Sequence, residues 1–282
     1  MPKIKFSLLS IIGGLTLLSS SAYAGVDAEV SYILNTLLFL IGGFLVMWMA
    51  AGFAMLESGL VTSKSVATIA AKNIGLYSIA GLMFWLVGYN LAYGIPEGGF
   101  IGSFLPWSDA SAVDTGYSDG SDWFFQMVFC ATTCSIVSGT LAERIKIWPF
   151  FLFCAILAGI IYPIEMGWQW GGGHLAAAGF SDFAGSTLVH SAGAAAALAG
   201  AILLGPRLGR FTDSGEAAPM APFASSSIPL ATLGVFILWM GWFGFNGGSQ
   251  LAMGSFDDST AVATIFINTN LAACAGVMAC AV

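Results

Sequence analysis

Residues 185–205 read GSTLVHSAGAAAALAGAILLG, a run of small and apolar residues with His190 as its one ionisable side chain. As a helix, the run is long enough to cross the hydrocarbon core of a bilayer, which takes about 20 residues. An ionisable group at membrane depth is costly, so it usually faces a pore or a partner and marks the path of an ion or a proton. The stretch therefore predicts a membrane helix that carries a functional histidine.

The composition of the whole chain agrees with a membrane location. Of its 282 residues, 57% are hydrophobic and 8% are charged, whereas soluble domains carry about 25% charged residues. The net charge of −7 comes from acidic connections and gives no signal for nucleic-acid binding. We predict an all-α polytopic membrane protein with about seven membrane segments after a signal peptide. The segments are expected at residues 31–57, 66–93, 122–142, 147–164, 185–205, 228–252 and 260–282.

Residues 1–24 are predicted to be a signal peptide, and residues 25–282 the membrane domain. Lys3 and Lys5 precede an apolar stretch at 8–18, and Ala22-Tyr23-Ala24 has the small-x-small pattern of a cleavage site. A short first membrane helix is the alternative, but about 11 apolar residues are too few for a span. The mature chain would then begin outside the cytoplasm.

The basic residues predict the orientation of the membrane domain. They follow the first, third and fifth segments, and the connections after the second, fourth and sixth have none. This alternation is the positive-inside pattern with the N-terminus outside. The chain ends in an apolar segment at Val282 without a polar flank, so we expect a fragment of a longer protein; a natural short product is the alternative. The basic residues are Lys64, Lys72, Arg144, Lys146, Arg207 and Arg210.

Four short strings resemble the ammonium transporter (Amt/Mep/Rh) family, and its bacterial Amt branch in particular. They are GFAMLESG at 52–59, LAER at 141–144, the string from Asp182 through His190, and GWFGFNGGS at 241–249. Because the strings occur in the family's order and are spread along the chain, the resemblance covers the whole mature domain. It implies a location in the bacterial cytoplasmic membrane, in contact with the lipid bilayer.

The resemblance assigns roles to aromatic and hydroxyl side chains. Family members recruit ammonium in an outer vestibule with an aromatic face and a hydroxyl, and Trp170 and Ser249 match these positions. Phe125 and Phe129 match the aromatic pair at the vestibule floor. Phe129 and Phe245 match the two stacked rings that close the pore. Without the resemblance, these phenylalanines would be packing or lipid-facing residues, and Trp170 an interfacial tryptophan.

The resemblance also gives roles to two ionisable residues. His190 matches the first of two pore histidines, and the second has no counterpart in this chain. Asp182 matches the buried acid that supports the site, and it precedes a helix start whose free backbone N–H groups a carboxylate can cap. A histidine that only hydrogen-bonds between helices is the alternative for His190. His174 is expected in a loop or the vestibule, on the outer side. Three other polar residues are expected to make structural contacts: Glu57, Lys72 and Asn73.

These residues suggest how ammonium is selected over K+, which has a similar size. A tryptophan face attracts a cation by ~0.5–2 kcal/mol, and the Ser249 hydroxyl can accept an N–H hydrogen bond that K+ cannot donate. An apolar pore strongly disfavours a bare ion. Ammonium avoids that penalty by leaving its proton behind and crossing as NH3. Neutral imidazole can hydrogen-bond NH3 and relay a proton.

The family architecture sets further expectations and alternatives. The family has about eleven transmembrane helices, an inverted repeat of five plus one, with the path between the halves. Implied partners are ammonium or ammonia, two further copies in a homotrimer, and a PII-type regulatory protein on the cytoplasmic face; no cofactor or metal is expected. We expect no transport by this 282-residue chain alone. Alternatives are an ammonium sensor with an Amt-like membrane domain and an Rh-like gas channel. A membrane enzyme is least favoured, because no nucleophile–base pair is evident.

Overall fold

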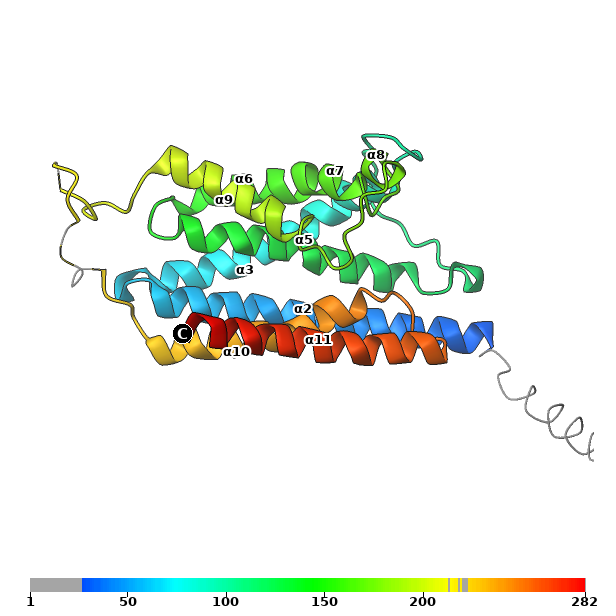
Figure 1. The fold of residues 1–282 in the computed structure, drawn as a ribbon. Coiled ribbons are helices and arrows are strands. Elements are labelled where there is room, and N and C mark those ends of the chain that lie inside the picture. The colour runs from blue at the N-terminus through cyan, green and yellow to red at the C-terminus, as the bar shows by residue number, and fades with distance from the viewer. Residues whose placement is uncertain (1–26, 213, 218, 220–222, 282) are drawn as a thin grey trace, which may run out of the picture.

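The computed structural model describes residues 27–212, 214–217, 219 and 223–281. The predicted signal peptide therefore lies outside the described residues. The described chain is a bundle of long helices that run back and forth between two ends (Figure 1). Its one β feature is an isolated bridge between Phe211 and Ala217. The long helices are α2 (Ala28–Leu60), α3 (Val66–Met83), α5 (Asp119–Leu141), α6 (Ile147–Ile156), α9 (His190–Leu204), α10 (Ile228–Gly248) and α11 (Phe256–Ala281).

The prediction of an all-helical membrane fold is confirmed, with one difference in the segments. Six continuous helical spans in the described residues are long and apolar enough to cross a membrane, and they coincide with six of the seven predicted segments. They are Ala28–Leu60, Ser63–Tyr93, Asp119–Leu141, Ile147–Gly167, Ile228–Gly248 and Phe256–Ala281, and the second and fourth each run through a π-helical turn. The segment expected at 185–205 is regular helix only over the 15 residues of α9, which is too short by that measure. Residues 185–189 form an irregular turn instead, because Gly185 adopts a left-handed φ of +87°. His190 is therefore the first residue of its helix, which begins five residues later than the predicted segment.

Helix α5 is the centre of the bundle and contacts α2, α3 and α9. Its buried residues include five serines and threonines among apolar side chains. The hydroxyls of Thr132, Thr133 and Ser135 donate to carbonyls of the same helix four residues earlier, as in Thr132 to Val128 at 2.8 Å and Thr133 to Phe129 at 3.2 Å. Since these hydroxyls are satisfied within the helix, this part of α5 can be buried without polar partners from its neighbours. Ser138, one turn further on, instead donates to Glu57 of α2.

Two neighbouring helices are interrupted by π-helical turns. One, η2 (Phe84–Gly88), joins α3 to α4 (Tyr89–Tyr93), and the other, η4 (Leu157–Ile161), joins α6 to α7 (Tyr162–Gly167). Pro163 explains the second, because a proline in a regular α-helix clashes with the carbonyl four residues earlier. The two turns pack together at Gly88, where a Cβ atom would lie 3.1 Å from Pro163 Cγ. There is no room for a larger residue at this crossing.

The long helices alternate in direction, so the connections that follow α2, α5 and α9 lie at the same end of the bundle (Figure 1). Lys64, Arg144, Lys146, Arg207 and Arg210 all belong to these connections. Lys72 does not. The orientation prediction included Lys72 among the basic residues that follow the first segment, but Lys72 is buried within α3.

Candidate functional site

Three phenylalanine rings form a column between α5 and α10. Phe125 and Phe129 are one turn apart on α5, with ring centroids 4.7 Å apart. The Phe129 ring stacks on that of Phe245 from α10, with centroids 3.9 Å apart and planes inclined by 25°. All three side chains are buried, each 1% exposed. Phe129 and Phe245, which the family resemblance assigns to the closure of a pore, are thus in direct contact.

A cavity of about 250 Å³ lies on one side of this column, at the end of the bundle where α2 begins. Its lining includes four side chains expected to bind the substrate: Phe125, Phe129, Trp170 and Ser249. The rest of the lining is mainly aromatic and includes Phe39, Tyr89, Tyr93, Tyr117 and Phe183. The cavity therefore offers several ring faces to whatever occupies it, together with polar groups of the tyrosines, Asp122, Gln126 and Ser249.

The polar atoms of Trp170 and Ser249 are held by backbone carbonyls. Trp170 Nε1 donates to the carbonyl of Asp182 at 2.8 Å, and the indole meets the Phe129 ring edge-on with centroids 5.9 Å apart. Ser249 Oγ donates to the carbonyl of Phe245 at 2.8 Å. Because the serine proton is directed to that carbonyl, the oxygen's lone pairs remain available to accept a hydrogen bond from a ligand.

The Asp182 carboxylate organises the turn before α9. It accepts from three backbone N–H groups, those of Gly185, Thr187 and Leu188, each at 2.8 Å. Gly185 is required at its position, since a Cβ there would lie 3.0 Å from the Trp170 ring and its φ is +87°. Asp182 thus connects the turn that presents His190 to the loop that carries Trp170.

His190 lies beyond the phenylalanine pair, on the side away from the cavity. Its ring contacts the Phe245 ring edge-on at 5.5 Å between centroids. Its Nδ1 is 3.1 Å from the carbonyl oxygen of Gly185, which can only accept, so Nδ1 carries the proton of the neutral ring and Nε2 is the acceptor. His190 and Phe245 line an open groove of about 650 Å³ that continues along α10 and α11 past Asn246 and Thr269. Phe129 thus lines the cavity, Phe245 lines the groove, and Phe183 lines both.

Comparison with known proteins decides the family. The model of the Ammonium Transporter Family matches residues 37–282, which is most of the chain.

The chain belongs to the ammonium transporter family.

Relatives include Ammonium transporter Amt2 of Archaeoglobus fulgidus, 42% identical over 252 residues that make up 84% of this chain and 51% of that protein. An ammonium transporter of Aquifex aeolicus is 35% identical over 264 residues, covering 92% of this chain and 58% of that protein. The chain thus spans about half the length of the curated relatives it matches.

Solved structures of Amt and Mep proteins have the same helical fold as this chain. A structure described as a sensor Amt protein superposes with a TM-score of 0.79 at 35% identity, over 88% of this chain and 61% of that one. Mep2 of Candida albicans superposes with a TM-score of 0.67 at 24% identity, over 84% of this chain and 51% of that one. The latter supports the fold alone.

The sequence missed one ionisable residue of the cavity, Asp122. Its carboxylate accepts from the Tyr89 hydroxyl at 2.6 Å and from Gln126 Nε2 at 3.1 Å, and all three residues line the cavity. Asp122 is the first residue of the segment predicted at 122–142, next to an acidic connection, and it was not among the predicted site residues. Its spacing could have indicated a place in the site. Asp122 precedes Phe125 by three residues and Phe129 by seven, so the three side chains share one face of the helix.

His174, the second histidine, is not among the residues that line the cavity. It begins the short helix α8 (His174–Ala177), and its ring stacks on that of Phe100 with centroids 4.2 Å apart. This agrees with the loop position that the sequence predicted.

A buried ion pair joins α2 to α3 in the other half of the bundle. Lys72 Nζ lies 3.1 Å from Glu57 Oε2, and the two side chains are 4% and 5% exposed. Ser138 of α5 and Asn73 also donate to Glu57 Oε2, at 2.9 and 3.3 Å. The prediction that Glu57, Lys72 and Asn73 make structural polar contacts is confirmed.

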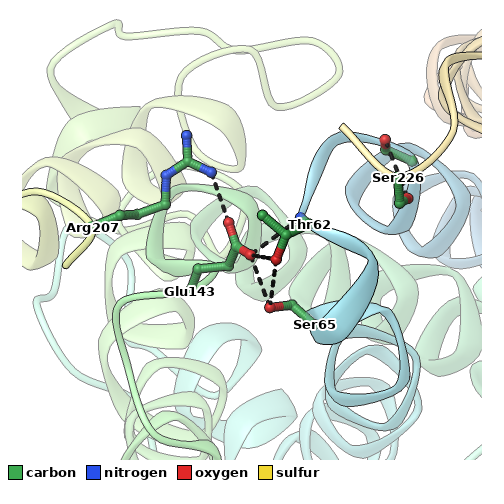
Figure 2. A network of polar contacts seen from close by, with 6 residues as sticks. Thr62, Ser65, Glu143, Arg207 and Ser226 are labelled. Atoms are coloured by element: carbon green, nitrogen blue, oxygen red, sulfur yellow. Dashed lines mark hydrogen bonds and ion pairs between the residues drawn. The ribbon is translucent and has the colours of Figure 1, made fainter. Parts of the chain in front are cut away.

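A second polar network joins three connections at the end of the bundle opposite the cavity (Figure 2). Glu143 points between Arg207 on one side and Thr62 and Ser65 on the other. Its Oε2 accepts from Arg207 Nη1 at 2.7 Å, and its Oε1 accepts from Ser65 Oγ at 2.8 Å and from both the hydroxyl and the backbone N–H of Thr62. Ser226 adds a separate bond to the carbonyl of Ser58, which ties the start of α10 to the end of α2.

This network predicts an acid-labile contribution to stability in the family member. Burial alone would raise the pKa of Glu143, but the hydrogen bonds from Thr62, Arg207 and Ser65 outweigh it and lower the pKa from 4.5 to about 2. A carboxylate with a lowered native pKa stabilises the fold fully above its unfolded pKa and loses that contribution as the pH falls towards its native pKa. We expect the parent protein to have a higher melting temperature than Glu143→Gln near pH 7. The difference between the two melting temperatures should shrink as the pH falls from 4.5 to 2. Thermal unfolding of the purified parent and variant tests this, and a difference independent of pH would contradict it.

Proposed function

We propose that the protein conducts ammonium or ammonia across the cytoplasmic membrane of a bacterium. The observation that carries the proposal is the order of groups along one line. Phe129 lines an aromatic cavity together with Trp170 and Ser249, and Phe245, which stacks on Phe129, lines a groove together with His190. This is the sequence of environments that selective passage of ammonium requires.

The cavity recruits the cation before it loses its proton. Trp170 and the neighbouring rings attract NH4+ through their negative faces, by ~0.5–2 kcal/mol at a tryptophan. Ser249 accepts one N–H hydrogen bond, because its own proton is held by the Phe245 carbonyl. K+ gains the ring interaction but has no N–H to donate, so the serine distinguishes the two ions.

The phenylalanine pair then prevents a charged species from passing. Phe129 and Phe245 offer no hydrogen-bond partner, and an ion without one pays a penalty of many kcal/mol in an apolar environment. Ammonium passes by giving up its proton to the imidazole relay that includes His190 and crossing as NH3. K+ and Na+ have no proton to lose and are excluded at this point.

His190 receives NH3 and takes part in proton transfer. With Nδ1–H bonded to the Gly185 carbonyl, the neutral ring offers Nε2 as an acceptor to a molecule in the groove. Imidazole can also relay a proton, because one ring nitrogen can accept a proton while the other donates one. Asp182 positions this ring through its three bonds to the preceding turn and takes no proton itself.

The proposal includes an orientation and partners. Connections with basic residues share one end of the bundle, which supports the cytoplasmic side for that end, with the N-terminus and the cavity outside. As in the family resemblance, the complete protein forms a homotrimer with one pore in each subunit. A PII-type protein binds its cytoplasmic face.

A second candidate function is ammonium sensing. It is favoured by the similarity to a structure described as a sensor Amt protein, with a TM-score of 0.79 and 35% identity. A sensor would keep the cavity and its ligand but need not conduct. The two functions therefore agree on binding at Trp170 and Ser249 and differ in uptake.

Uptake of labelled methylammonium tests the proposal in a transporter-deficient bacterium that expresses the complete gene. We expect uptake at limiting substrate, lost by at least tenfold in His190→Ala and reduced or made less selective over K+ in Ser249→Ala. Membrane amounts of each variant, measured by immunoblot, control for expression. A correctly inserted parent that binds ammonium without taking it up would refute transport and support the sensor.

A further inference from the structure

Two buried carboxylates lie near the cavity, and they differ in how much of their charge is available. Both oxygens of Asp182 are engaged by backbone N–H groups: Oδ1 by Gly185, and Oδ2 by Thr187 and Leu188. Backbone N–H groups at a helix start carry partial positive charge. The Asp182 charge is therefore compensated within its own turn, and this residue is not in the cavity lining.

Asp122 is in a different situation. It is 5% exposed and is the only charged residue among the described residues that line the cavity. Its two hydrogen-bond donors, the Tyr89 hydroxyl and the Gln126 amide, are neutral side chains that also line the cavity. These bonds orient the carboxylate but add no positive charge. A negative charge thus remains in the wall of an aromatic cavity.

We propose that Asp122 is the anionic element of the cation-binding cavity and sets its affinity for ammonium and small alkylammonium ions. The proposal rests on the proposed function and adds to it a recruiting charge on the wall formed by α5. Aromatic faces and neutral hydroxyls bind a cation weakly, because each ring contributes only ~0.5–2 kcal/mol. A partly buried carboxylate adds a coulombic attraction that bulk water does not fully screen.

The tyrosines beside Asp122 strengthen this assignment. Tyr89 and Tyr93 lie with ring centroids 4.9 Å apart, and Tyr117 packs edge-on against Phe39 at 4.8 Å. A carboxylate surrounded by aromatic rings is a combination that favours cations, since the rings attract the ion and exclude competing water. The cavity of about 250 Å³ is large enough to admit methylammonium as well as ammonium.

The test compares half-saturation constants for methylammonium uptake by the complete protein. Asp122→Asn keeps the shape and removes the charge, and we expect its half-saturation constant to rise about tenfold with the maximal rate within twofold of the parent. Asp119→Asn is the matched control, because it makes the same change one turn earlier on α5 outside the cavity lining. Asp122→Glu should keep most of the affinity.

Tyr89→Phe separates the charge from the hydrogen bond. It removes the hydroxyl bonded to Asp122 and leaves the carboxylate, so its half-saturation constant should stay within threefold of the parent. If Tyr89→Phe raises the constant as much as Asp122→Asn, or if Asp122→Asn leaves it unchanged, the proposal is wrong. Asp122→Ser serves in place of the asparagine variant if the latter does not assemble.

Failure of the proposed function is recognised separately. Thermal stabilisation of the purified protein by ammonium chloride, relative to sodium chloride, reports binding without transport. A parent that binds but does not take up methylammonium refutes transport, and the shift of its binding midpoint in Asp122→Asn still tests the role of Asp122. A parent that neither binds nor transports refutes both.

Discussion

Replacing Asp182 with alanine is expected to abolish methylammonium uptake and to lower the melting temperature of the protein strongly. The substitution removes the acceptor of three backbone N–H groups, those of Gly185, Thr187 and Leu188. A buried donor left without a partner costs about 1–3 kcal/mol, so the loss amounts to several kcal/mol. The turn that presents His190 to the groove would rearrange to satisfy these groups. Uptake assays, together with thermal unfolding of the purified variant, measure both effects.

Asp182→Asn is the informative control for this prediction. Its amide keeps one oxygen that can accept from backbone N–H groups, and its nitrogen cannot accept any. We therefore expect an intermediate melting temperature and residual uptake. A proton carrier at this position would behave differently, because asparagine would then be as inactive as alanine while the fold stayed stable. Parent-like stability and uptake in Asp182→Ala would contradict the role of this carboxylate altogether.

The fold could be predicted from hydropathy because the bilayer sets the length of each helix. Six of the seven expected segments are helices long enough to span. The exception shows what hydropathy misses. Residues 185–189 are as apolar as the helix that follows, and they leave the helix because Gly185 and the side-chain bonds of Asp182 stabilise a different turn. Such a turn depends on side-chain contacts to the backbone, which an average over 20 residues does not detect.

The π-helical turns were also not predicted, although one left a trace in the sequence. Pro163 lies near the end of an apolar segment, where it must interrupt the regular hydrogen bonds. Nothing comparable marks the turn at Phe84–Gly88, which follows from the close packing of Gly88 on Pro163. To predict an irregular turn that a neighbouring helix imposes, one must know which helices pack together.

For the candidate site, helix spacing predicts only contacts within one helix. Phe125 and Phe129 had to share a face of their helix because they are four residues apart. The stack of Phe129 on Phe245 joins α5 to α10, and it was expected only from the family resemblance. Asp122 was missed although its helix spacing was informative, because an acidic residue at a predicted helix end is usually assigned to the adjoining loop.

Replacing Gly234 with alanine is expected to destabilise the protein by about 3 kcal/mol, near the upper end for overpacking a well-packed interior. Gly234 of α10 faces α2, the helix that α10 contacts most extensively. A Cβ atom there would lie 2.7 Å from the carbonyl oxygen of Gly52 and 2.8 Å from Leu56 Cα, and closer still to Leu56 N. These are backbone atoms, so no side-chain rotation can relieve the overlap and the two helices must separate.

The same substitution at Gly81 provides the control, because a Cβ atom there meets only Met127 Sδ at 3.7 Å, an ordinary contact. Gly81→Ala should leave the melting temperature unchanged or raise it slightly, since alanine favours a helix more than glycine does. Membrane helices gain no hydrophobic driving force from lipid and depend on such close backbone approach for association. Equal melting temperatures for the two variants would mean that α2 and α10 are held together by other contacts. A loss confined to Gly234→Ala, with uptake falling in parallel, would show that the cavity depends on this helix pair for its shape.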